Sequence, residues 1–209
     1  MALRIFTRSV FMQTRMPIRK DPSKVLQLAT GEKYGATESN LSSIKLFLAD
    51  KYAIPDDLAL QVITHKSFTN GLKPYNEKLS AMGSKVLNLF LAKFVVEGAT
   101  TNDLAVNGKN LDVLGTPIAK ELGGRMALGL FAQSTKLNNT MFWKSYNSLL
   151  SFQESGELKV SAQMMYALVG AVTFIHGKKA AEAFVREKLL EGPVTLEGIA
   201  SEFLEQNQA

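Results

Sequence analysis

Apolar residues recur every three or four positions over much of this chain, which is the spacing of helices with one buried face. In residues 40–52, Leu41, Ile44 and Leu48 fall on one side, and Asn40 is a candidate N-cap. The pattern therefore predicts an amphipathic helix near the start of the periodic region.

The longest such pattern covers residues 76–96. Leu79, Met82 and Val86 lie along one stripe, serines and other polar residues lie along another, and Gly98 follows the last periodic position. A helix of about five turns is expected here, since one turn takes 3.6 residues.

Other segments carry the same period and lack the alternation of strands. Further helices are predicted over residues 56–68, 101–121, 124–133, 139–151, 159–176 and 178–190. No convincing two-residue period and no internal repeat is present. The expected fold class is all-α.

The chain divides by composition into four parts. They are residues 1–20 as a leader, 21–39 as a linker, 40–192 as a helical domain and 193–209 as a tail or short helix. The linker assignment rests on Pro, Gly and Ser without sustained periodicity. No apolar run approaches the roughly 20 residues of a membrane span, so none is predicted. The absence of cysteine excludes disulfides, thiolate zinc sites and cysteine nucleophiles.

Charge is unevenly distributed along the sequence. The chain has 24 basic and 19 acidic residues, and residues 1–20 hold five of the basic ones and no acid: Arg4, Arg8, Arg15, Arg19 and Lys20. The remaining 19 basic residues are matched by 19 acidic ones. A neutral body predicts weak affinity for naked RNA, because phosphate contacts need clustered Lys and Arg.

The segment 1–20 is rich in arginine and hydroxyl residues and free of acid, which is typical of a mitochondrial transit peptide. The alternative is a disordered basic tail that contacts RNA phosphates. The composition favours the transit peptide, and the expected location is the mitochondrial matrix.

Two ordered motifs carry a family resemblance. THKSF at residues 64–68 precedes NEKLSAMGSKVL at 76–87, and KVSAQMMYALVGAVTFIHG follows at 159–177. These stretches resemble the ribonuclease III family, which has a Thr-His-Arg/Lys-Ser-aromatic segment, then Asn-Glu-Arg/Lys-Leu, and later Lys-Val-x-Ala. The resemblance covers about residues 40–190 and implies a helical ribonuclease III-like domain.

The same motifs depart from the family at the residues that do its chemistry. The family holds magnesium with four carboxylates on two helices, and magnesium prefers such hard oxygen ligands and generates the attacking hydroxide. Those four positions are Ser80, Ser84, Gln163 and Tyr166 here. The resemblance therefore implies a protein that is not an enzyme, with no catalytic residue, metal ligand or cofactor.

The remaining candidates for chemistry have structural explanations. Glu77 is expected to be a first-turn or capping acid, and His65 to pack or to form hydrogen bonds. Phe142, Trp143 and Tyr146 have helical spacing, which favours a core face over a platform for base stacking.

Partner contacts are implied mainly by the resemblance, because domains of this family dimerise through the helix of the first motif. The predicted protein interface is Leu79, Ala81, Met82 and Val86. The predicted RNA-contacting residues are Lys85, Lys93, Lys109, Lys178, Lys179 and Arg186. No double-stranded-RNA-binding domain follows the helical domain in this sequence, so RNA affinity is expected from the domain itself or from a partner.

These features favour a non-catalytic structural component of the mitochondrial large ribosomal subunit. Its expected partners are large-subunit rRNA and other mitochondrial ribosomal proteins, among them a second ribonuclease III-like protein as a heterodimer partner, with no small-molecule substrate. The alternative is a non-catalytic subunit of an organellar RNA-processing or editing complex. A metal-dependent nuclease that uses unmatched carboxylates is the least favoured reading.

Overall fold

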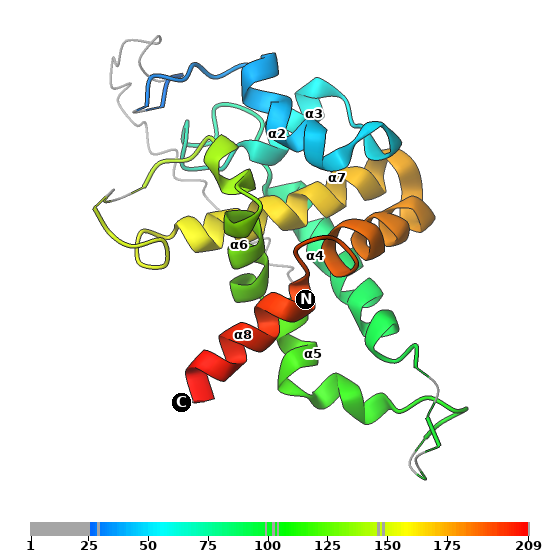
Figure 1. Ribbon diagram of the computed structural model, residues 1–209. Coiled ribbons are helices and arrows are strands. Elements are labelled where there is room, and N and C mark those ends of the chain that lie inside the picture. Colours follow the sequence, from blue (N-terminus) through cyan, green and yellow to red (C-terminus); the bar gives the residue numbers. More distant parts are fainter. Residues whose placement is uncertain are drawn as a thin grey trace, which may run out of the picture.

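The computed structural model describes residues 26–208 apart from 29, 99, 102, 104, 146 and 148. These residues form an all-helical fold, which confirms the predicted fold class (Figure 1). Their only β-type pairings are isolated bridges. The predicted leader, residues 1–20, lies outside the described residues.

The helices differ widely in length. The α-helices are α2 (Glu38–Leu48), α3 (Asp56–Ile63), α4 (Glu77–Val95), α5 (Pro117–Leu122), α6 (Arg125–Ser134), α7 (Glu157–Val185) and α8 (Leu196–Gln208). The shorter helical segments are η1 (Asp50–Tyr52), η2 (Leu111–Gly115), η3 (Leu137–Thr140) and the π-helical η4 (Arg186–Leu190).

Helix α2 begins two residues before the predicted N-cap. The side chain of Thr37 caps it by accepting the backbone N–H of Asn40 at 3.4 Å. The Asn40 amide instead donates to the carbonyls of Lys33 and Gly35, at 3.0 and 2.8 Å. Asn40 therefore ties the preceding segment to α2, because both donors of its amide point back along the chain.

Helices α4 and α7 cross at the centre of the molecule and make its most extensive packing contact (Figure 1). Two glycines meet at the crossing. A Cβ added to Gly83 would overlap the Tyr166 carbonyl oxygen and lie 2.6 Å from the Gly170 nitrogen. A Cβ added to Gly170 would lie 3.0 Å from the Leu79 carbonyl carbon. The two backbones are therefore in direct contact, which only residues without a side chain permit.

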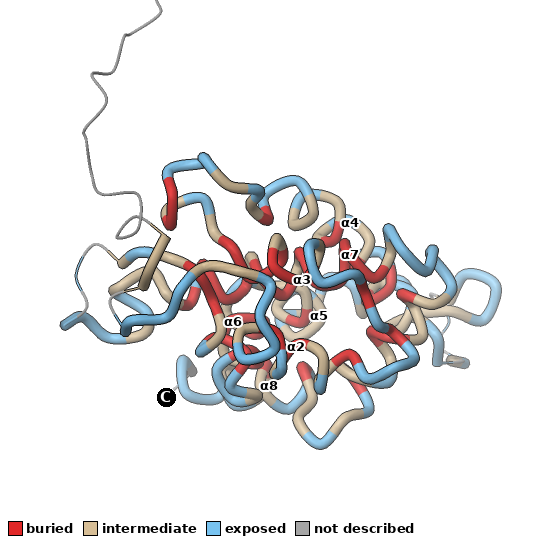
Figure 2. Tube along the Cα trace, turned by 90° about the horizontal axis from the view of Figure 1, so that it is seen from above, coloured by how far each residue is buried: buried red, intermediate tan, exposed pale blue. Residues whose placement is uncertain are grey.

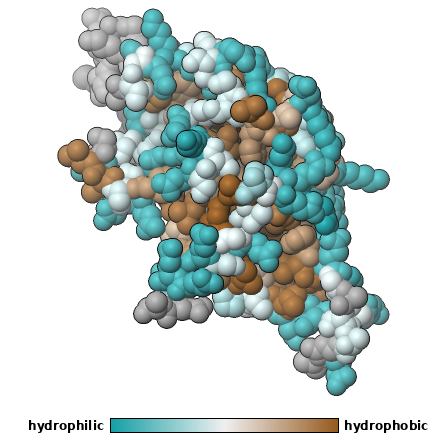
Figure 3. All heavy atoms as spheres, in the orientation of Figure 1, coloured by the Kyte–Doolittle hydropathy of each residue, from teal (hydrophilic) through white to brown (hydrophobic). Residues whose placement is uncertain are grey.

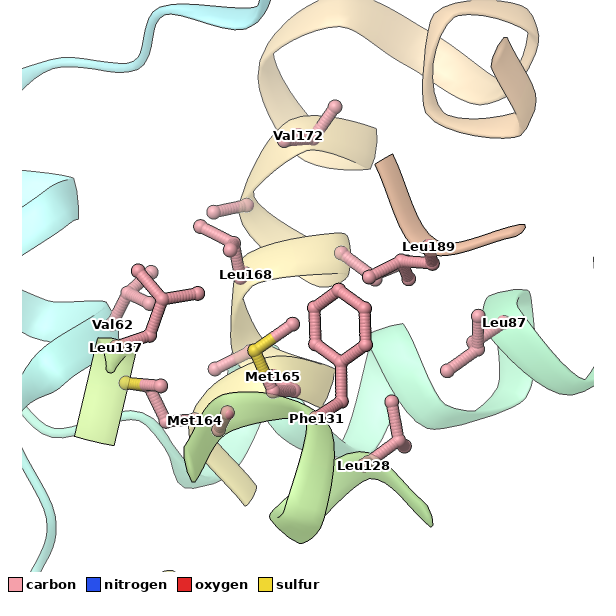
Figure 4. Close-up of a cluster of buried hydrophobic side chains, with 14 of the residues drawn as sticks. Val62, Leu87, Leu128, Phe131, Leu137, Met164, Met165, Leu168, Val172 and Leu189 are labelled. Atoms are coloured by element: carbon pink, nitrogen blue, oxygen red, sulfur yellow. The ribbon is translucent and has the colours of Figure 1, made fainter. Parts of the chain in front are cut away.

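The core surrounds α7, and the buried segments gather around the α4–α7 pair in Figure 2. Phe131 of α6 points from its helix toward Met165 of α7, with Leu128 and Leu189 beside it (Figure 4). Leu87 brings α4 into the same cluster. A single core thus fixes the relative positions of α4, α6 and α7, which supply the candidate site.

The helix predicted over residues 101–121 is wrong for most of its length. Asn107 and Gly108 both have positive φ, 52° and 73°, and form a tight turn. Only η2 and the short α5 follow, because Pro117 starts a new helix at its first position. Apolar atoms gather over α5 and the C-terminal part of α4 on the face shown in Figure 3.

The helix predicted over residues 139–151 is also wrong. Phe142 is extended and forms a parallel bridge with Thr64, and its backbone N–H donates to the Ile63 carbonyl at 2.8 Å. The same pairing ends α3 at Ile63, five residues before the predicted end. Phe142 is nevertheless buried and Trp143 packs against the core, as predicted for them. Tyr146 lies outside the described residues.

Helix α7 contains a break at the position where two helices were predicted to meet. Gly177 has φ 81° and ψ 175°, so the chain turns there and the second part folds back beside α4. By length and composition the segment Glu157–Leu190 could cross a membrane, but 61% of its most apolar window is buried in the domain. Both the turn and the burial indicate a core helix of a folded domain.

Both flanks of the domain pack onto it. Tyr34, in the segment predicted as a linker, stacks on Phe68 with ring centroids 5.6 Å apart and meets the edge of Phe142 at 5.3 Å. Helix α8 buries Leu196 and Ala200 and packs against α5 and α6. The C-terminal segment, for which a tail or a short helix was expected, thus contains a helix that packs on the domain.

Candidate functional site

The first motif forms the connection between α3 and α4. The Thr64 hydroxyl donates to the Leu60 carbonyl at 2.6 Å and closes the end of α3. Ser67 joins this connection to the segment after η3, because its hydroxyl oxygen accepts the backbone N–H of Lys144 at 3.0 Å. Phe68 is buried in the core. The motif thus fixes the entry into α4.

Asn76 is a buried junction of three segments. Its side-chain amide donates to the Val62 carbonyl at 3.0 Å, and its side-chain oxygen accepts from Gln163 Nε2 at 3.1 Å. Its backbone N–H donates to the Thr64 carbonyl at 3.0 Å. Asn76 therefore connects α3, the start of α4 and α7 at the inner edge of the site.

The four positions expected to carry carboxylates in an active relative converge. They line an open hollow of about 360 Å³ between α4, α6 and α7, whose lining is Glu77, Ser80, Ala81, Ser84, Arg125, Lys159, Gln163 and Tyr166. The i,i+4 spacing on α4 and the i,i+3 spacing on α7 place these side chains on facing stripes.

Three of these four side chains form hydrogen bonds within the domain. The Ser84 hydroxyl donates to the Ala81 carbonyl at 3.2 Å, and Gln163 is held by Asn76. The Tyr166 hydroxyl donates to the Gly123 carbonyl at 2.6 Å, in the turn between α5 and α6. Burial raises the pKa of Tyr166, so the phenol stays neutral and acts as a tether between α7 and this turn.

Glu77 is the one acid among the described residues that line the hollow. It lies in the first turn of α4, the position predicted for it, where a negative charge favours the helix dipole. It also pairs with Lys66 at 3.7 Å, with both side chains more than half exposed. Among the described residues, no three His, Asp or Glu side chains come close enough together to hold a metal ion.

Two positively charged residues line the hollow that were not predicted from the sequence to belong to the site. Arg125 is the first residue of α6, and Lys159 lies in the first turn of α7. Lys159 is one turn before Gln163, so the α7 stripe could have revealed it. Arg125 follows two glycines and carried no signal, because only the folded chain brings α6 to this place.

His65 lies half-buried beside the hollow. Burial lowers the pKa of its imidazole, and a hydrogen bond that the ring donates to the Gln163 side chain offsets part of that effect. His65 Nδ1 accepts the backbone N–H of Ser67 at 3.2 Å. This is the hydrogen-bonding role predicted for it. His176 Nε2 lies 2.7 Å from the Ala53 carbonyl oxygen and holds the turn of α7 against η1.

The predicted RNA-contacting residues do not form one strip. Lys93, Lys109 and Arg186 meet around a separate hollow of about 250 Å³. There Lys93 pairs with Glu182, and Lys109 donates to the Glu97 carbonyl. Arg186 pairs with the Glu97 carboxylate at 2.7 Å. Outside this cluster, in exposed positions, lie Lys85, Lys178 and Lys179.

The predicted protein interface is divided between the core and the surface. Leu79 and Val86 pack partly against the domain's own core. Met82 is half-buried, and Ala81 is exposed at the rim of the hollow. Ala81 is therefore the member of this set that a partner could contact without disturbing the core.

Comparison with known proteins agrees with this architecture. The model of the ribonuclease-III-like family matches residues 55–192, which include both motifs and the hollow. Large ribosomal subunit protein mL57 of Neurospora crassa is 24% identical over 140 residues, which cover 62% of this chain and 52% of that protein. The chain thus spans about half the length of this relative. Because the family model covers most of the chain and all of its central helices, the protein belongs to the ribonuclease-III-like family.

Proposed function

We propose that this protein is a non-catalytic structural component of the mitochondrial large ribosomal subunit. In this role its ribonuclease-III-like domain contacts rRNA and a protein partner. The observation that carries the proposal is the lining of the α4–α7 hollow, which has two cations and one carboxylate. Ser80, Ser84, Gln163 and Tyr166 are neutral residues in the places of the four expected metal ligands, and a magnesium site needs several anionic oxygens.

Two further observations support the location and the assembly. The name of the Neurospora crassa relative describes a protein of a large ribosomal subunit. Residues 1–20 have the arginine-rich, acid-free composition of a mitochondrial transit peptide. Together they favour the mitochondrial matrix and the large-subunit rRNA as surroundings of the domain.

For the protein partner we propose helix α4, with Ala81 on its exposed side and Leu79, Met82 and Val86 as the other members of the predicted interface. A second ribonuclease-III-like protein would fit, because members of this family pair through this helix. An interface of about 1,600 Å² is ample for stable association.

Sedimentation of a mitochondrial extract through a magnesium-containing gradient tests the assignment. The protein is expected to migrate with the large ribosomal subunit and to stay there after a mild salt wash. Migration in a smaller particle that contains an active nuclease would instead establish the alternative, a non-catalytic subunit of an organellar RNA-processing or editing complex.

The proposed interface has its own test. Ala81→Arg is expected to release the protein from its assembly, since an unpaired charge would be buried against the partner, whereas added positive charge would not weaken a contact with RNA. Because Ala81 is exposed, the variant should keep its fold. Ala36→Arg, at an exposed alanine outside α4, is the matched control and should leave assembly unchanged. Equal retention of both variants would show that this side of α4 is not the interface.

A further inference from the structure

The α4–α7 hollow has an excess of positive charge that its own domain does not neutralise. Arg125 and Lys159 both line it and are exposed. Among the described residues, neither has a carboxylate within 4.0 Å. This distinguishes them from Lys93 and Arg186 in the other basic cluster, which pair with acids.

The acids near the hollow are already engaged. Glu77 pairs with Lys66 at 3.7 Å. Glu121, whose charge acts on Tyr166, accepts the backbone N–H of Ala127 at 3.2 Å and so serves the start of α6. Two cations therefore face the hollow while each nearby carboxylate has another partner.

Neutral donors complete the lining. Ser80 lines the hollow from α4, one turn from Ser84. Among the described residues no side-chain hydrogen bond of Ser84 reaches across the hollow, because its hydroxyl donates back to the Ala81 carbonyl. An open space of about 360 Å³ with two cations and hydroxyl donors suits a tetrahedral oxyanion that reaches it from the surface.

We infer that this hollow binds a backbone phosphate of RNA directly, through Arg125 and Lys159, with Ser80 as a neutral donor and without a metal ion. The guanidinium group of Arg125 can offer two parallel N–H donors to one phosphate, and Lys159 adds a point charge. The choice of RNA over an acidic peptide rests on the proposed function. A contact between one phosphate and two cations needs only a local excess of positive charge. It is therefore compatible with the equal numbers of basic and acidic residues outside residues 1–20.

The test measures binding of a short fluorescein-labelled RNA duplex to the purified protein in EDTA. The double variant Arg125→Gln/Lys159→Gln is expected to bind about 5- to 10-fold more weakly than the parent, as two lost exposed charge contacts imply. The dependence of log affinity on log salt should also become shallower by about 1, because the slope follows the number of phosphates neutralised and the two cations share one.

A matched control removes the same charge elsewhere. Lys136→Gln/Lys188→Gln alters two cations that line a different hollow, between α2, α6 and η4. Its affinity should stay within about twofold of the parent, the size expected for long-range screening alone. Equal losses in both double variants would overturn the inference, because they would show a response to net charge and not to the site.

A second pair of variants tests the sign of the charge without removing either cation. Ser84→Asp is expected to weaken duplex binding in EDTA, whereas Ser84→Asn, of the same size and neutral, should retain it. Equal affinity of these two variants would overturn the inference. So would a glutamate-rich peptide that competes as well as unlabelled duplex.

These results are separable from the proposed function. If the duplex measurements fail while the protein still migrates with the large ribosomal subunit, the phosphate site is wrong and the structural role stands. If the variants behave as expected but the protein migrates elsewhere, the hollow binds RNA in another assembly. Melting temperatures equal to that of the parent should accompany each variant, since all the altered side chains lie at the surface or at the rim of the hollow.

Discussion

The two sides of the α4–α7 pair place very different demands on their residues. At the crossing, Gly83 and Gly170 bring the two backbones into contact, and no side chain fits between them. At the hollow, the neighbouring residues Ser84 and Gln163 face open space of about 360 Å³. A packed contact tolerates few residue types, because interiors are as dense as organic crystals. Residues that line an open space can be replaced by others of different chemistry while the fold stays the same. The two motifs can therefore retain the glycines of the crossing and lack the carboxylates expected at the hollow.

Mutations at the crossing should therefore cause the largest loss of stability. Gly83→Ala places a methyl group over the Tyr166 carbonyl and 2.6 Å from the Gly170 nitrogen, so the helices must separate. We expect a loss of about 4 kcal/mol or more in the free energy of unfolding, measured by urea denaturation. Gly115→Ala, where nothing lies within 4 Å, is the control and should change little. Near-equal stability of the two variants would contradict the close approach of α4 and α7.

Mutation of Asn76, which lies at the inner edge of the hollow, should lower the stability of the domain less than mutation of the crossing. Asn76→Ala removes the donor to the Val62 carbonyl and the acceptor for Gln163, and leaves buried polar groups unpaired. The expected loss is about 2 kcal/mol in the free energy of unfolding. Asn139→Ala, at an exposed asparagine of η3, should cost far less. If Asn76→Ala changed the free energy of unfolding as little as Asn139→Ala, the hydrogen bonds of Asn76 would not contribute to stability as the packed core does.

The packed side of the helix pair also contains a buried polar group without a hydrogen-bond partner among the described residues. Ser161 is fully buried on α7, and its hydroxyl has no hydrogen-bond partner among the described residues. Ser161→Ala is expected to raise the free energy of unfolding by about 1 kcal/mol, because it removes an unpaired buried polar group. Ser201→Ala in α8 measures the gain from helix propensity alone. If both gains are equal, the Ser161 hydroxyl carries no penalty.

The smallest expected effect is the pH dependence of stability that is caused by His65, which lies beside the hollow. Burial lowers the pKa of His65, so the unfolded chain binds more protons than the folded one below the ordinary histidine pKa of about 6.5. Stability should then fall as the pH drops below about 6.5 and stop falling once His65 is protonated in the folded state too.

Urea unfolding at several pH values measures this effect. His65→Gln should reduce the loss of stability on acidification, because it removes the buried imidazole. A parent and a His65→Gln variant with the same pH profile would show that the imidazole is protonated equally easily in both states.

Regular helices and the spacing of the motifs were predictable from the sequence alone. Helix α4 was expected over residues 76–96 and spans Glu77–Val95, since a long stripe of one period leaves little choice. The break at Gly177 was expected too, because a glycine separates two periodic segments. That Ser80 and Gln163 belong to one site on two helices was implied by the family resemblance, since the spacing within each helix does not show which helices meet.

The remainder depended on contacts between distant parts of the chain. Phe142 has helical spacing with its neighbours, yet its backbone pairs with Thr64 and becomes extended. Arg125 reaches the hollow only because α6 packs on α7. The pairing of Lys93 and Arg186 with acids likewise needed the fold, because Glu182 and Glu97 come from other segments.

The contact between Asn76 and Gln163 also sets the order in which the chain can fold. The two residues are 87 positions apart, so α4 leaves the translating ribosome long before α7 exists. Closing so long a loop costs conformational entropy that is recovered only when both helices dock. Until then Leu87, Phe90 and Leu91 of α4, all buried in the finished domain, lack their partners. The domain therefore folds late and cooperatively, and a chain that stops before Glu157 leaves an apolar helix for chaperones to shield.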